Sequence, residues 1–167
     1  MGGIDMTYTI RKMDYKDIQS VQRVAKISWN ATYEGIIPLQ IQTNFLEEAY
    51  SDEKMKLRLE RSIVYVAEIA GEIVGFANYS NVRQGGKVEL AAIYLYPEVQ
   101  GQGIGSALLQ IAKDELDGIK EIYMNVEEEN TIGRNFYEAK GFTVIDQFEE
   151  LFDGHLLKNI RMVLVVQ

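Results

Sequence analysis

Cysteine is absent from the 167 residues, proline occurs twice, and histidine and tryptophan occur once each. Without cysteine the chain forms no disulfide, no thiolate metal site and no cysteine acyl-enzyme. No residues have the spacing of metal ligands, so we expect no metal. The sequence has no run of roughly 18 apolar residues, and its start lacks a basic segment followed by an apolar core. We therefore expect a cytoplasmic protein with no transmembrane helix, no secretory signal and no membrane partner.

Positive charge is also scarce. The chain has 17 lysines and arginines against 25 aspartates and glutamates, which gives a net charge of −8. Binding to nucleic acid needs a basic surface that neutralises phosphates, so nucleic acid is not an expected partner. A negative field favours a cationic small-molecule ligand, although acidity also keeps proteins soluble, and that simpler explanation stays open.

Length and patterning indicate a single domain over residues 1–167, and we expect residues 1–5 to be an added extension ahead of Met6. Alternation and helical spacing predict the element order β-α-α-β-β-β-α-β-α-β-β. The predicted strands are 7–13, 62–69, 73–79, 88–96, 121–126, 142–152 and 156–166. The predicted helices are 15–34, 38–60, 104–116 and 130–140. This order predicts a mixed α/β (α+β) fold, with a mostly antiparallel sheet of about seven strands flanked by about four helices.

A glycine-rich turn, Gln100-Gly101-Gln102-Gly103-Ile104-Gly105, follows the strand 88–96 and opens the helix 104–116. Glycines let the backbone approach a ligand closely, and the N–H groups at a helix start attract anions. The turn is not a Walker A loop, because no Gly-Lys-Ser/Thr follows it, and it lacks the GxGxxG spacing of dinucleotide-binding folds. The pattern therefore predicts a site for a phosphate or pyrophosphate group.

Two segments together resemble the GNAT acetyltransferases. Ile93–Pro97 followed by Gln100–Gly105 is similar to motif A of that family, Gln/Arg-x-x-Gly-x-Gly/Ala after an apolar strand. Asn130 and the segment Asn135–Phe142 resemble motif B, N…A-x-x-F-Y-x-x-x-G-F, with Arg134 standing where many members have a small residue. The resemblance covers residues 63–142 well and the first two helices loosely. It implies one GNAT domain with the GNAT fold, and acetyl-CoA as co-substrate.

The resemblance also implies roles for individual residues. The backbone of residues 93–95 would pair with the pantetheine arm and the acetyl carbonyl, and residues 100–105 would hold the pyrophosphate through N–H groups. Asn130 and Arg134 would lie along the cofactor, and Tyr137 beside the thioester sulfur. The cofactor-binding residues implied in this way are Ile93, Tyr94, Leu95, Gln100, Gly101, Gln102, Gly103, Ile104, Gly105, Asn130, Arg134 and Tyr137.

Two side chains are candidates for catalysis. Tyr137 is a phenol with an ordinary pKa of about 10, which suits a general acid for the leaving thiolate; the alternative is a core aromatic behind Phe136. Glu89 resembles the strand glutamate proposed as base in several GNAT enzymes, and its alternative is an exposed strand end. Even spacing predicts that Glu89 and Ile93 share one face of their strand, with Tyr94 on the opposite face in the core.

The acceptor side is predicted from the first helix. Trp29 and Tyr33, four residues apart, lie on one helical face just before the turn Gly35–Pro38. In similar GNAT proteins this segment borders the acceptor pocket, so we expect both residues to bind substrate, with core packing as the open alternative. His155, the single histidine, is expected at the surface beside a hairpin turn.

Three functions are compatible with these residues. The first is acetyl transfer to a primary amine of a small cationic acceptor, by direct attack in a ternary complex; the acidic balance and a general likeness to bacterial spermidine/spermine acetyltransferases favour a polyamine. The second is peptide N-terminal or lysine acetylation. The third is a non-catalytic acyl-CoA-binding sensor, against which Tyr137 argues. The apolar end, Val163–Val166, would either pair across a homodimer or form an internal strand, and both remain open.

Overall fold

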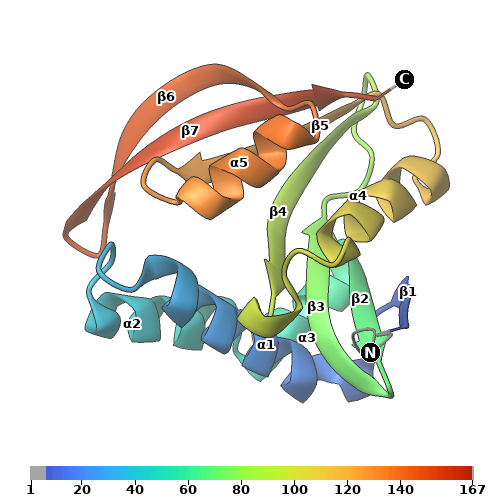
Figure 1. Cartoon of the computed structure of the whole chain (residues 1–167), viewed down its shortest axis with the longest axis horizontal. Coiled ribbons are helices and arrows are strands. Elements are labelled where there is room, and N and C mark those ends of the chain that lie inside the picture. The colour runs from blue at the N-terminus through green and yellow to red at the C-terminus, as the bar shows by residue number, and fades with distance from the viewer. Residues whose placement is uncertain (1–6, 167) are drawn as a thin grey trace, which may run out of the picture.

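Within residues 7–166, which the computed structural model describes, seven strands form one sheet and five α-helices pack around it (Figure 1). The strands are β1 (Tyr8–Lys12), β2 (Ile63–Ile69), β3 (Glu72–Tyr79), β4 (Lys87–Leu95), β5 (Glu121–Glu127), β6 (Thr143–Phe152) and β7 (His155–Val165). The helices are α1 (Ile18–Tyr33), α2 (Leu39–Ala49), α3 (Asp52–Arg61), α4 (Ile104–Glu115) and α5 (Thr131–Ala139). The predicted mixed α/β fold is confirmed, and the predicted extension at residues 1–5 lies outside the described part.

The helix predicted for residues 38–60 is wrong in one respect, because the structure divides it into α2 and α3. Helix α2 ends at Ala49, and Tyr50 leaves the helical conformation with φ −121° and ψ 25°. Ser51 then starts a new helix, since its side chain accepts a hydrogen bond from the N–H of Lys54 at 3.2 Å. Four polar residues, Ser51-Asp52-Glu53-Lys54, stand at this break, and a serine followed by acidic residues is a local signal for a helix start that the prediction missed.

The strand order in the sheet is β1-β2-β3-β4-β5-β7-β6. Strands β4 and β5 pair in parallel, and every other neighbouring pair is antiparallel. Strand β7 lies between β5 and β6, and Val163 is paired with Tyr123 on one side and Thr143 on the other. The apolar end of the chain therefore lies within the sheet, as one of the two alternatives drawn from the sequence expects, and a homodimer through the final hairpin stays a prediction.

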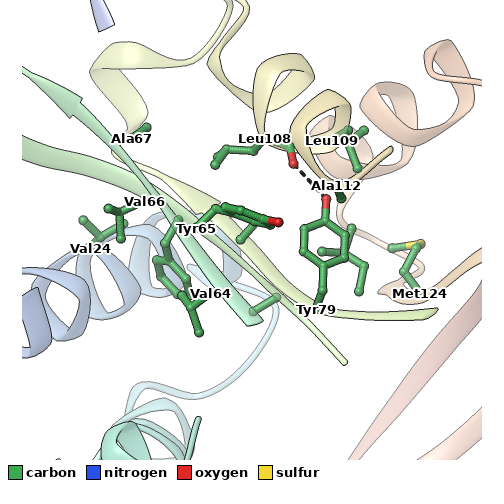
Figure 2. Close-up of a cluster of buried hydrophobic side chains, with 14 of the residues drawn as sticks. Val24, Val64, Tyr65, Val66, Ala67, Tyr79, Leu108, Leu109, Ala112 and Met124 are labelled. Carbon is green, nitrogen blue, oxygen red and sulfur yellow. Dashed lines mark hydrogen bonds between the residues drawn. The ribbon is translucent and has the colours of Figure 1, made fainter. Parts of the chain in front are cut away.

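The core lies on both faces of β2 and β3. Alternation along β2 directs Val64 and Val66 toward α1 and Tyr65 toward α4 (Figure 2). Helix α1 packs on β3 and β4, and α4 packs across β1 to β4 on the other face. In the described chain no helix combines the length and the hydropathy needed to cross a membrane.

Removing the hydroxyl group from each of two buried tyrosines in this core should affect stability differently. The hydroxyl of Tyr79 donates to the carbonyl oxygen of Leu108 at 2.9 Å, whereas the buried hydroxyl of Tyr65 has no hydrogen-bond partner among the described residues (Figure 2). We expect Tyr79→Phe to lower the free energy of unfolding by about 1 kcal/mol, and Tyr65→Phe to leave it unchanged or raise it. Urea unfolding of the two variants measures the difference, and an equal loss in both would contradict it.

Candidate active site

The site begins where two parallel strands separate. Strands β4 and β5 pair through Lys87–Glu89 and Glu121–Tyr123, and beyond this short ladder they diverge (Figure 1). A cleft of about 810 Å³ opens between them. Its walls are the remainder of β4, the end of β5, the first turn of α4, helix α5 and the last turns of α1. A single concave site is thus assembled from segments across most of the chain.

A β-bulge in β4 decides which side chains face the site. The adjacent β3 residues Asn78 and Tyr79 pair with Ala92 and Leu90 of β4. Ala91 between them has no partner in β3 and is the extra residue of the bulge. After the bulge, each side chain of β4 lies on the face of the sheet opposite to the one that simple alternation predicts. Ile93 consequently faces α4, while Glu89 lies on the opposite face together with Tyr94. The predictions that Glu89 shares a face with Ile93, and that Tyr94 lies opposite Glu89, are therefore wrong.

The same bulge orients the backbone of β4. The N–H of Tyr96 donates to the carbonyl oxygen of Val74 in β3 at 2.9 Å. Because N–H groups alternate along a strand, the N–H of Tyr94 also points to β3, and those of Ile93 and Leu95 point into the cleft. These two donors have the position needed for the predicted backbone contacts to a ligand. Tyr94 meets the site differently, since its hydroxyl accepts a hydrogen bond from the indole of Trp29 at 2.8 Å.

The glycine-rich turn lies at the other end of the cleft, before α4. Gly103 is the N-cap residue of α4 and has a left-handed backbone, with φ 86° and ψ 0°. No side chain of the described chain caps this helix end, so the N–H groups of Ile104 to Ser106 are free to bind a ligand. At Gly105 an added Cβ would lie 3.0 Å from the Phe136 ring, so a larger residue would require that ring to shift, and glycine favours the close approach of α4 to α5. These uncapped donors fit the pyrophosphate of coenzyme A.

Helix α5 brings the motif B residues to the cleft. Asn130 caps the helix by accepting a hydrogen bond from the N–H of Gly133 at 2.9 Å, and an added Cβ at Gly133 would lie 2.6 Å from the Asn130 side chain. Asn130 and Tyr137 line the cleft. Arg134 turns away from it, and its guanidinium donates to the carbonyl oxygen of Glu128 at 3.0 Å. The contact predicted between Arg134 and the cofactor would require this hydrogen bond to break.

Tyr137 is both a cleft residue and a buried one, with an exposed fraction of 9%. Its ring packs edge-on against Phe136 and Phe142, with centroid distances of 5.4 and 5.5 Å. Burial, with a smaller contribution from Tyr33, raises the pKa of Tyr137 well above its ordinary value of 10. The phenol therefore stays protonated at neutral pH, as a proton donor must.

The two predicted acceptor residues of α1 have different positions. Tyr33 lines the cleft, and burial, followed by the charge of Glu127, raises its pKa to about 12. Trp29 lies behind the cleft wall, stacked on Phe45 with centroids 4.5 Å apart and packed with Leu157. Trp29 therefore packs in the core, which was the alternative left open by the sequence. It contacts the cleft only indirectly, through its hydrogen bond to the hydroxyl of Tyr94.

His155 is not the surface residue predicted from the sequence. It is half-buried, and its Nε2 lies 3.1 Å from the carbonyl oxygen of Ile36 in the turn between α1 and α2. Next to it, Asn44 of α2 donates to the carboxylate of Asp153 at 3.1 Å. These two contacts attach the tip of the β6–β7 hairpin to the α1–α2 turn, where Figure 1 shows the two segments side by side. None of the four residues in these contacts is among those that line the cleft.

Glu89, the predicted base, is held by a distant arginine. Its two carboxylate oxygens accept hydrogen bonds of 2.8 and 3.0 Å from Arg161, which also donates to Asn125 at 3.0 Å. Glu89 is half-buried and lies outside the set of residues that line the cleft. A base role for Glu89 stays a prediction, and it would require Arg161 to release the carboxylate.

One buried carboxylate near the cleft was missed from the sequence. Glu127 is the last residue of β5 and has an exposed fraction of 7%. It is the first of three consecutive glutamates, a pattern that is typical of a solvated surface segment, so the sequence contains no signal for its burial. In residues 7–166 no group of three or more acidic or histidine side chains is arranged to hold a metal ion.

Comparison with known proteins agrees with this geometry. The pattern of the Acetyltransferase (GNAT) family matches residues 23–142. A spermidine N(1)-acetyltransferase of Thermoplasma acidophilum is 32% identical over 149 residues, which are 84% of this chain and 91% of that relative.

Solved structures are similar as well. The PaiA N-acetyltransferase of Thermoplasma acidophilum in complex with coenzyme A superposes with a TM-score of 0.81 and 29% identity, covering 95% of this chain and 98% of that one. The ribosomal-protein-S18-alanine N-acetyltransferase of Escherichia coli has a TM-score of 0.72 at 22% identity, covers 96% and 95% of the two chains, and shows the fold alone. The family pattern, the relative and the cleft with its anion-binding turn lead to one conclusion: this chain belongs to the GNAT family and is an N-acetyltransferase that uses acetyl-CoA.

Proposed function

We propose that the whole chain acts as one domain that transfers the acetyl group to a primary amine of a small cationic acceptor, with a polyamine as the first candidate. The observation that carries this proposal is the relative that acts on spermidine, which matches 84% of the chain. The net charge of −8 favours a cation.

In this proposal acetyl-CoA supplies an acetyl group activated as a thioester. The N–H groups around Gly103 bind its pyrophosphate, and Asn130 lies along it. The N–H of Ile93 donates to the acetyl oxygen as negative charge develops there, which lowers the barrier to attack, and the N–H of Leu95, two residues further along β4, pairs with the pantetheine arm. The amine attacks directly in a ternary complex, since the chain has no cysteine to form an acyl-enzyme.

The reaction also needs one proton donor and one proton acceptor, and a residue is proposed for each. Tyr137 donates a proton to the sulfur that leaves, because its buried phenol is neutral and lines the cleft. The incoming amine must lose a proton, and Glu89 is proposed to accept it through water once Arg161 moves aside. Tyr33 forms the neutral wall of the acceptor end.

A panel of acceptors tests the substrate class. We expect coenzyme A release from acetyl-CoA to exceed the acceptor-free background with spermidine and spermine, and to stay near background with amino acids, aminoglycosides, and lysine or N-terminal peptides. Initial rates at varied concentrations of both substrates should give intersecting reciprocal plots, as a ternary complex requires; parallel plots would indicate an acyl-enzyme. Activity with peptides alone would overturn the small-molecule proposal, and silence with every acceptor while acetyl-CoA still binds would favour a sensor.

A further inference from the structure

Glu127 is a buried carboxylate without a cationic partner. Its Oε2 accepts a hydrogen bond of 2.7 Å from the N–H of Glu129. Among the described residues no lysine, arginine or histidine lies within salt-bridge distance of it, and the two residues that follow are also acidic. Carboxylates are rarely buried unless they are paired, because desolvation of the charge is costly. Burial, the largest influence, raises the pKa of Glu127 above its ordinary value.

The register of the sheet places Glu127 beside the acceptor end of the cleft, although its own side chain is not one of those that line the cleft. Glu127 is paired with Asn159, so the two side chains share a face of the sheet, and Leu157 of β7 lies on the same face two residues earlier. Leu157 packs in one cluster with Tyr33. Glu129, in the loop that follows Glu127, lines the cleft directly, as does Tyr33.

Tyr137, the proposed proton donor, lines the same cleft as Tyr33. Tyr33 lies near both groups, since the charge of Glu127 raises the pKa of Tyr33 and Tyr33 in turn raises the pKa of Tyr137. An acceptor with one amine at Tyr137 would bring a second amine, several bonds away, toward the buried carboxylate. A lysine ammonium or a polyamine nitrogen satisfies such a group through charge-assisted hydrogen bonds.

We infer that Glu127 is the anchor for a distal ammonium group of the acceptor, and that it selects diamines and polyamines over amines with a neutral tail. The inference rests on the proposed function and deepens it. The Oε1 atom, which accepts no hydrogen bond within residues 7–166, receives the ammonium N–H, and Oε2 keeps its bond to the Glu129 backbone. The acceptor cation is thus the counter-ion that the protein itself does not provide.

Glu127→Gln tests the anchor because glutamine still accepts the Glu129 N–H but carries no charge. We expect kcat/KM for 1,6-diaminohexane and for spermidine to fall about 30-fold, which is the size of one lost charge-assisted hydrogen bond. With hexylamine, which has the same chain length and a neutral tail, kcat/KM should change less than about threefold. Glu128→Gln is the matched control, since it removes the same charge from the exposed neighbour and should leave both acceptors unaffected.

Thermal unfolding gives a second measurement that does not depend on turnover. The carboxyl has a raised pKa in the folded state, so its ionisation at neutral pH costs stability, and Glu127→Gln should unfold at the same or a higher temperature than the wild type. Spermidine should raise the Tm of the wild type and of Glu128→Gln, and not that of Glu127→Gln. A role limited to the turn predicts a lower Tm without spermidine and an unchanged shift with it.

The outcomes separate this inference from the proposed function. If the wild type acetylates no amine with a second charge, the proposed function fails before the variant is compared. If the wild type acetylates spermidine and Glu127→Gln does so equally well, the anchor alone is wrong. Equal losses with 1,6-diaminohexane and hexylamine would place Glu127 at the reacting amine and would also overturn the anchor.

Discussion

Replacing Tyr137 with phenylalanine should lower kcat by about 100-fold or more while the affinity for acetyl-CoA stays nearly the same. The change removes one hydroxyl and keeps the ring, so the packing against Phe136 and Phe142 is retained. The leaving sulfur then departs without a proton from the protein. Steady-state kinetics gives kcat, and calorimetric titration with coenzyme A gives the affinity.

The control for this experiment is Tyr79→Phe, which removes another buried tyrosine hydroxyl, one that donates to Leu108 of α4 and does not belong to a residue lining the cleft. It should lose stability and keep its turnover. The raised pKa of Tyr137 adds a pH criterion: from about pH 7 to 9 the wild-type kcat should show no decline caused by loss of this proton. Unchanged turnover in Tyr137→Phe would remove the general-acid role.

The second large effect is expected at the turn before α4, where Gly103→Ala should weaken coenzyme A binding by about tenfold or more, equivalent to about 1.4 kcal/mol. Gly103 has φ 86°, a conformation that costs an alanine roughly 1–2 kcal/mol. The backbone would relax toward negative φ and rotate the N–H groups at the start of α4 away from the pyrophosphate. Calorimetric titration with coenzyme A measures this loss.

Gly85→Ala separates lost binding from lost stability. Gly85 lies in the turn before β4 with φ 83°, and an added Cβ there meets nothing within 4 Å. The backbone strain is therefore matched to that of Gly103→Ala, and both variants should unfold at lower temperature. Only Gly103→Ala should bind coenzyme A more weakly, and equal affinities in the two variants would show that the turn does not hold the pyrophosphate.

Much of the fold was predictable because its signals are local. The apolar alternation of the strands and the glycine-rich turn are properties of short segments, and the structure places them as expected. The break between α2 and α3 also has a local signal, the N-cap residue Ser51 followed by Asp52 and Glu53, and it was missed because the prediction followed the apolar residues on either side.

The site was harder to predict because the positions of its side chains depend on contacts between residues that are far apart in the sequence. The bulge at Ala91 is a property of how β4 pairs with β3, and its side-chain consequences for Glu89 and Tyr94 follow from that pairing. Arg161 reaches Glu89 across 72 residues of sequence. Glu127 is buried by the neighbouring strand and by the approach of α1, and neither is visible in a run of three glutamates.

The parting of β4 from β5 has a consequence for the lifetime of the protein. The cleft edge of β4 presents backbone groups that find no strand partner in the described chain, and a ligand lying along that edge supplies the missing neighbour. A molecule that binds the folded chain and not the unfolded one stabilises it by mass action. Resistance to unfolding and to proteolysis should then rise and fall with the supply of acetyl-CoA, so that the abundance of the enzyme reports the metabolic state that provides its substrate.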